Sequence, residues 1–85
     1  MKIQLLVSDW SPPCRRAEEL WRAVAREVDV ELEILNVTEP TGAEIMKRLQ
    51  LKTISALVID HQLVAIGVQS KDEARKIAAT THSRR

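Results

Sequence analysis

The 85-residue sequence predicts a single α/β domain, in which a four-stranded mixed sheet carries helices on both faces. Three observations support this fold class. Short apolar runs, typical of strands, alternate with segments whose apolar residues recur every three or four positions, as in amphipathic helices. No Gly/Ser-rich or Pro-rich linker divides the chain. At roughly 100 to 200 residues per domain, the length has room for only one hydrophobic core.

The first segments predict a central strand followed by a long helix. Residues 3–7 form an almost continuous apolar run that ends at Ser8, which indicates a strand buried on both faces of the sheet. In residues 12–28 the apolar side chains recur at steps of three and four, so this helix should have one apolar stripe. Ser11 is its expected N-cap and Pro12 its first residue, where the missing N–H of proline costs nothing.

The next segments predict an edge strand and a short helix. In residues 30–34 the apolar side chains alternate with Glu31 and Glu33, the pattern of a strand with one wet face. Acidic side chains at this position discourage pairing with another sheet, which favours an edge. Thr41 and Glu44 have the spacing of a capping box, so the short helix should begin there.

The last third of the chain predicts a hairpin and a final helix. Residues 56–59 and 63–66 are two apolar runs separated by a three-residue turn that contains His61 and lacks the favoured glycine. Ser70 and Glu73 form a second expected capping box, which opens the final helix.

The resulting order is strand, helix, strand, helix, strand, strand, helix. A right-handed crossover should make the first two strands parallel, while the hairpin strands should be antiparallel. We expect one domain over residues 1–79, followed by a polar and frayed tail over residues 80–85.

Composition excludes several functional classes. Thirteen basic and twelve acidic residues create no field for nucleic acid, and two Trp with no Phe or Tyr leave few rings for stacking on bases. One cysteine forms neither an internal disulfide nor a Cys-based zinc site, so we expect no metal and no other cofactor. The sequence has neither a signal-peptide pattern nor an apolar run near the ~20 residues of a membrane span. We therefore expect a cytoplasmic protein without a nucleic-acid or membrane partner.

Three sequence features resemble a known family. Residues 10–14, Trp-Ser-Pro-Pro-Cys, lie at the junction of the first strand and first helix, and resemble the Trp-Cys-x-x-Cys motif of thioredoxin-like proteins, the small thioredoxins and glutaredoxins. Residues 51–59 resemble the Val-x-x-Ile-Pro-Thr segment that leads into the third strand of the family. Gly67 falls where family members carry a glycine near the end of the fourth strand. The resemblance covers about residues 2–79 and implies the minimal thioredoxin-like fold, βαβαββα.

Two positions depart from the family pattern. Ser11 stands where the family has its first cysteine, whose thiolate attacks the substrate, and Ser55 stands where the family has a cis-proline facing the active site. Because a serine hydroxyl is largely un-ionised at neutral pH, it does not replace the attacking thiolate. The resemblance therefore implies an altered chemical centre that consists of Cys14 and Ser11, without dithiol cycling inside the chain.

Cys14 is open to three interpretations. Its place near the start of a helix, followed by Arg15 and Arg16, favours a reactive thiolate. Its position on the same apolar stripe as Ala17 and Trp21 favours a buried structural side chain. A disulfide or metal link to a second molecule is the third interpretation.

The resemblance also implies a binding surface around the motif. In the family, the tryptophan at the position of Trp10 borders the active-site groove and contacts partners. Ile54 and Ser55 would lie opposite it, where family members bind extended polypeptide through backbone pairing. The expected partner is a protein or a small thiol, and the expected binding residues are Trp10, Pro12, Pro13, Ile54, Ser55 and Gly67.

Three functions remain open from the sequence. The first is a thioredoxin-like module that binds a partner and has impaired redox chemistry. The second is a monothiol, glutaredoxin-like redox protein in which Cys14 exchanges with glutathione or with a partner disulfide. In the third, Ser11 replaces a cysteine of the natural protein, which would then be a dithiol oxidoreductase. A catalytic serine is not expected, because His61 lies in the hairpin turn, remote from Ser11.

Overall fold

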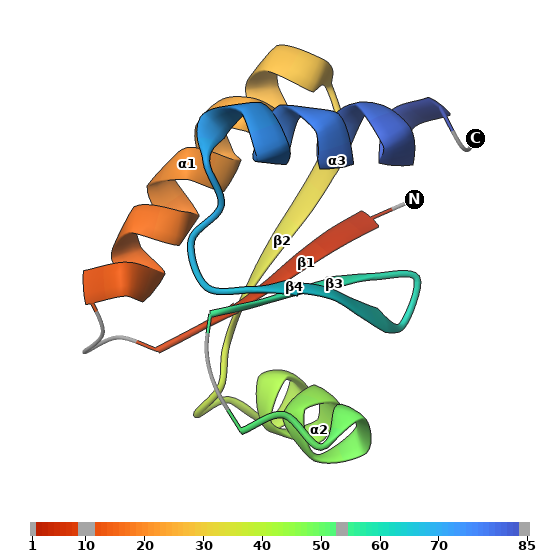
Figure 1. Cartoon of the computed structure of the whole chain (residues 1–85). Helices are drawn as coiled ribbons and strands as arrows, with labels where there is room; N and C mark the ends of the chain where they lie inside the picture. Colours follow the sequence, from red (N-terminus) through yellow and green to blue (C-terminus); the bar gives the residue numbers. More distant parts are fainter. Residues whose placement is uncertain (1, 9–11, 53–54, 84–85) are drawn as a thin grey trace.

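The computed structural model of the chain describes residues 2–8, 12–52 and 55–83. These residues form the predicted order of elements, which confirms the α/β fold class (Figure 1). The elements are β1 (Lys2–Val7), α1 (Pro12–Val28), β2 (Glu31–Asn36), α2 (Pro40–Leu49), β3 (Ala56–Ile59), β4 (Gln62–Ile66) and α3 (Lys71–Ser83).

The four strands form one mixed sheet in the order β2-β1-β3-β4. Strand β1 is parallel to β2, with Leu5 opposite Ile34, and antiparallel to β3, with Leu5 opposite Leu57. Strands β3 and β4 pair antiparallel. The central position of β1 and the edge position of β2 are therefore confirmed. Helices α1 and α3 cover one face of this sheet and α2 covers the other (Figure 1).

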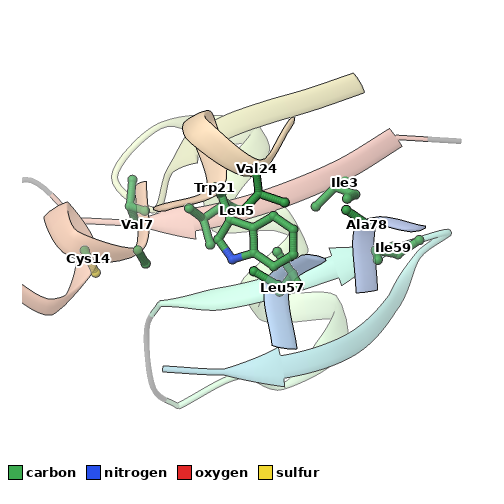
Figure 2. Packing of buried hydrophobic residues seen from close by; sticks show 11 residues of the cluster. Ile3, Leu5, Val7, Cys14, Trp21, Val24, Leu57, Ile59 and Ala78 are labelled. Atoms are coloured by element: carbon green, nitrogen blue, oxygen red, sulfur yellow. The ribbon is translucent and has the colours of Figure 1, made fainter. Parts of the chain in front are cut away.

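Strand β1 is apolar along its length because it contributes to a core on each face of the sheet. Ile3, Leu5 and Val7 face α1 and α3, where Trp21 lies at the centre of the packing (Figure 2). Leu6 faces the other way and packs with a smaller cluster around Ile45 of α2. The prediction that this strand is buried on both faces is confirmed.

Helix α2 begins two residues earlier than the capping-box pattern predicts, because that pattern would make Thr41 the N-cap. Its N-cap is Glu39, in extended conformation and without a side-chain cap hydrogen bond, so the predicted pair of Thr41 and Glu44 does not cap the helix. The physical reason is Pro40, whose fixed φ and missing N–H suit the first helical position. Gly42 then lies so close to β2 that a Cβ there would clash with the Asn36 carbonyl oxygen.

The β3–β4 hairpin is confirmed, but its turn is tighter than the sequence predicts. Asp60 and His61 both adopt left-handed backbone conformations, with φ of 56° and 66°, so the two residues alone reverse the chain. Strand β4 therefore starts at Gln62 rather than at Leu63. His61 is exposed in this turn.

The start of α3 follows the prediction. The backbone N–H of Glu73 donates to the Ser70 Oγ at 3.2 Å, which satisfies one of the free donors of the first turn and confirms the expected capping role of Ser70.

Helix α3 continues to Ser83, so residues 80–83 are helical and do not form the predicted frayed tail. The hydroxyls of Thr80 and Thr81 donate to the carbonyls of Lys76 and Ile77, each at 2.9 Å, so these polar side chains are satisfied inside the helix. Thr81 is also buried, since it continues the inward stripe of the helix.

Candidate functional site

The described residues assigned to the site lie at one end of the sheet. Strand β1 ends at this point and is followed by Ser8, β3 begins just after Ser55, and β4 is followed by Gly67. The ends meet because β3 is antiparallel to both of its neighbours. Helix α1 starts at the same end with Pro12, and we call this region the motif end. Trp10, Ser11 and Ile54 fall outside the residues that the structure describes.

Cys14 is the third residue of α1 and carries a free thiol that is only 1% exposed. It shares the buried stripe of the helix with Ala17, Trp21 and Val24, which recur at helical spacing. Figure 2 shows its side chain beside Val7, at one end of the packed cluster. The stripe therefore turns the thiol toward the core.

Among the described residues, the buried polar side chains are all uncharged. The buried polar residues of the described ranges are Ser8, Ser55, Gln69 and Thr81, and no carboxylate, amine or imidazole is among them. The neighbouring Arg15 and Arg16 are exposed. Reactive cysteines combine positive surroundings with partial exposure. Cys14 has the flanking charge without the exposure, which favours a structural side chain.

The hydroxyl of Ser8 is an unsatisfied polar group among the described residues of the motif end. It is buried, and its Oγ has no hydrogen-bond partner within the described part of the chain. Desolvating a hydroxyl without a partner costs about 1–3 kcal/mol. The sequence indicated this residue only as the end of the first strand.

Ser55 and Gly67 join the ends of β3 and β4. The Gly67 N–H donates to the Ser55 carbonyl at 2.8 Å, and the fully buried Ser55 Oγ donates to the Gly67 carbonyl at 3.1 Å. Gly67 has a φ of 86°, which glycine adopts without strain, while a Cβ at this position would meet no atom within 4 Å. The glycine is therefore required by backbone conformation rather than by lack of space.

Gln69 connects the motif end to the core, and sequence reasoning missed it. The Trp21 Nε1–H donates to the Gln69 Oε1 at 3.1 Å, and the Gln69 Nε2 donates to the Gly67 carbonyl at 3.2 Å. A tryptophan inside an apolar stripe indicates that its N–H needs a buried acceptor. The sequence alone does not say which residue supplies it.

The described groups with shifted pKa values lie away from the motif end, between α1 and α3. The Arg75 guanidinium donates to the Glu27 carboxylate at 2.9 and 3.3 Å, and this hydrogen bond holds the pKa of Glu27 below its ordinary value of 4.5. The charges of Arg75 and Lys71 act in the same direction. The same hydrogen bond raises the pKa of Arg75.

Among the described residues, no group of three or more His, Cys, Asp or Glu is placed to hold a metal ion. In the same residues, no helix combines the length and the apolar character needed to cross a membrane.

The sheet order, with a cysteine-bearing helix starting at the carboxyl end of central strand β1, defines a thioredoxin-like α/β domain. A family model described as a thioredoxin domain matches residues 1–79, and the chain belongs to that family. The predicted family and fold are thus confirmed. A search of curated proteins gives no match.

Solved structures show the same fold at low sequence identity. Chloroplastic thioredoxin z superposes with a TM-score of 0.77 at 16% identity, covering 96% of this chain and 78% of that one. Thioredoxin 1 from the thermophilic eubacterium Thermosipho africanus has a TM-score of 0.74 at 16% identity, with 99% and 98% covered. Fasciola hepatica thioredoxin has a TM-score of 0.70 at 20% identity, with 95% and 79% covered.

Proposed function

We propose that this thioredoxin-domain protein binds a protein partner at the motif end and performs no dithiol/disulfide cycling within its own chain. The observation that carries the proposal is the burial of Cys14, whose thiol is 1% exposed and packs against apolar side chains. A thiol in this position is poorly accessible to a disulfide of another molecule, because exchange requires direct attack of sulfur on sulfur.

Dithiol chemistry would also need a second sulfur, and Cys14 is the single cysteine of the sequence. In the family pattern the missing thiol corresponds to Ser11, so the proposed role of Ser11 is to occupy the position of the attacking residue without its reactivity. The proposal therefore treats the motif as a recognition element.

The proposed binding surface uses the open part of the motif end. Pro12 and Pro13 are exposed at the start of α1, and Gly67 is partly exposed at the end of β4. Ser55 lies beneath this surface and fixes the position of Gly67 through two hydrogen bonds. Trp10 and Ile54 complete the proposed surface by their correspondence to the family motif. An extended polypeptide segment is the proposed ligand, by analogy with the backbone pairing that the family uses.

Monothiol exchange with a small thiol is the competing function. It is favoured by the position of Cys14 in the first turn of α1, which contains no acidic side chain and is followed by Arg15 and Arg16. It requires the first turn of α1 to open before the sulfur meets a second molecule, since the thiol is buried in the closed structure.

Restoring the missing thiol tests the proposal. The Ser11→Cys variant and the wild type are assayed for reduction of a disulfide-bonded peptide with dithiothreitol as electron source. We expect the variant to be active and the wild type to be inactive. If the wild type reduces the peptide disulfide, the proposal fails in favour of monothiol chemistry. If the variant forms a stable disulfide with Cys14 but has no activity, a redox-enzyme origin of the site is contradicted.

The same assay tests partner binding. Excess wild-type chain should compete with the Ser11→Cys variant for the peptide and raise its apparent KM without changing kcat. The matched control is the Pro13→Glu chain, which changes one exposed side chain of the proposed surface and should compete less. Equal competition by both chains, or none by either, would contradict binding at the motif end.

A further inference from the structure

The exposed large apolar side chains of the described residues gather on one strand and the residues that follow it. Leu63, Val64, Ile66 and Val68 are 41%, 44%, 51% and 44% exposed. We call these four residues the β4 strip. Isolated apolar side chains on a surface need no explanation, but a contiguous apolar patch marks an interaction site.

The β4 strip is uncovered on both faces of the sheet. Leu63 and Ile66 pair with Val58 and Ala56, which face α2, so they lie on the α2 side of the sheet. The buried core on that side, however, is formed by β1, β3 and α2, and leaves both side chains open. On the opposite side Val64 lines an open groove of about 360 Å³ beside Ile77 of α3. Strand β4 therefore projects beyond the helices that cover the rest of the sheet.

The two edges of the sheet differ in charge. On the β2 edge, Lys2 lies 3.9 Å from Glu31 and 3.6 Å from Glu33, and Gln4 donates to Glu33. Charged side chains of this kind discourage the pairing of one sheet with another. Residues 62–70 on the β4 side contain no charged residue. The β4 edge contains a β-bulge opposite Leu57 and Val58, a local distortion of the kind that limits pairing with another sheet.

We propose that the β4 strip is a self-association surface, on which a second copy of this chain places its own β4 antiparallel across a two-fold axis. An interface of this symmetry brings the same patch of two copies together, so the patch must complement itself. An uncharged apolar strand meets this condition, because no like charges are brought face to face. A charged partner segment, by contrast, would find no opposite charge on the strip residues themselves, and the charged side chains Asp60 and Lys76 line only the groove beside Val64.

The register follows from the shared face of Leu63 and Ile66. The bulge places these two residues on the same side of the sheet although they are three positions apart. In the proposed antiparallel pair, Leu63 of each copy lies opposite Ile66 of the other copy. These four side chains form one apolar cluster. The backbone groups of β4 that point away from β3 then continue the sheet from one copy into the other.

The dimer should be weak. Four half-exposed side chains per copy offer less than the ~800 Å² per partner that a standard interface buries. We therefore expect a monomer in dilute solution and a dimer that becomes populated at roughly 0.1 to 1 mM. This inference does not depend on the proposed function of the motif end.

Sedimentation velocity from about 10 µM to 1 mM tests the inference. The wild type should show a weight-average mass that rises with concentration. Ile66→Lys puts a charge into the apolar cluster and should raise the dissociation constant at least about tenfold. Leu63→Lys tests the same face independently if Ile66→Lys does not fold. The matched control, Thr41→Lys, adds the same charge on the exposed surface of α2 and should leave association unchanged.

Amide hydrogen exchange provides the second readout. The backbone N–H groups of β4 that point away from β3 should exchange more slowly at 1 mM than in dilute solution, roughly in proportion to the dimer population. A mass that stays monomeric at the highest concentration overturns the inference. So does a dimer that Ile66→Lys and Leu63→Lys leave intact, or one in which β4 gains no protection.

Discussion

The hydrogen bond between Trp21 and Gln69 allows a quantitative test of how the motif end is attached to the core. The two residues are 48 positions apart, and their buried side chains meet at 3.1 Å. Gln69→Leu removes the acceptor with little change in size and leaves the indole N–H without a partner. Trp21→Phe removes the donor and leaves the amide oxygen of Gln69 unpaired instead. Each single change therefore creates a buried group whose hydrogen bond is lost.

The magnitude follows from the cost of such groups. A neutral hydrogen bond contributes about 0.5–1.5 kcal/mol, and an unsatisfied buried partner costs about 1–3 kcal/mol. The double variant loses both partners together, so it should be more stable than the sum of the single changes predicts, by roughly 1–2 kcal/mol. For a domain of this size, 1 kcal/mol corresponds to a change of about 4–8 °C in Tm.

The assay is urea unfolding of the wild type, the two single variants and the double variant, followed by far-UV circular dichroism. Changes in the free energy of unfolding that add within about 0.3 kcal/mol would refute the reasoning, since additivity means that the two side chains do not interact. A normal m-value in all four proteins checks that the unfolding transition stays two-state.

Three further variants test other contacts. Ser8→Ala removes a buried hydroxyl without a partner and should raise the free energy of unfolding by about 1 kcal/mol, and a loss of stability in urea unfolding would mean that Ser8 is satisfied. Gly42→Ala should cost about 1–3 kcal/mol despite the better helix propensity of alanine, because its Cβ meets the Asn36 carbonyl, and unchanged stability would contradict that contact. The lowered pKa of Glu27 contributes stability that is present above pH 4.5 and is lost as the pH falls through the lowered value. Glu27→Gln should remove this part of the acid dependence of Tm. In the wild type, 1 M salt should weaken the same acid dependence, since the pair with Arg75 is exposed. If Glu27→Gln shows the same acid dependence as the wild type, this role of Glu27 is contradicted.

The parts of the fold that depend on local pattern were predictable. The apolar run of β1 predicted burial on both faces, and the three- and four-residue spacing in α1 predicted that Trp21 faces the core and favoured the same orientation for Cys14. The errors arose where two local signals compete. Pro40 starts α2 ahead of the capping pair that begins at Thr41, and Thr81 is polar by composition but buried by its place on the helix.

The candidate site was predictable only in part. The helical spacing placed Cys14 on the inward stripe of α1, and the resemblance gave Ser55 and Gly67 as binding residues without predicting the hydrogen bonds between them. The role of Gln69 was not accessible, because its two hydrogen bonds depend on contacts that only the folded chain brings together. The binding roles of Trp10, Ser11 and Ile54 stay predictions, since these residues lie outside the described part of the chain.

The most direct test of the central claim is the reactivity of the Cys14 thiol in the native wild-type protein. The thiol is titrated with 5,5′-dithiobis(2-nitrobenzoate) at pH 7, in native buffer and in denaturant, at a concentration where the chain is monomeric. A buried sulfur reacts through transient opening of the structure, so the native rate should be at least about 100-fold below that of the unfolded chain. A native rate equal to or above that of the unfolded chain would contradict the account and identify Cys14 as a reactive monothiol.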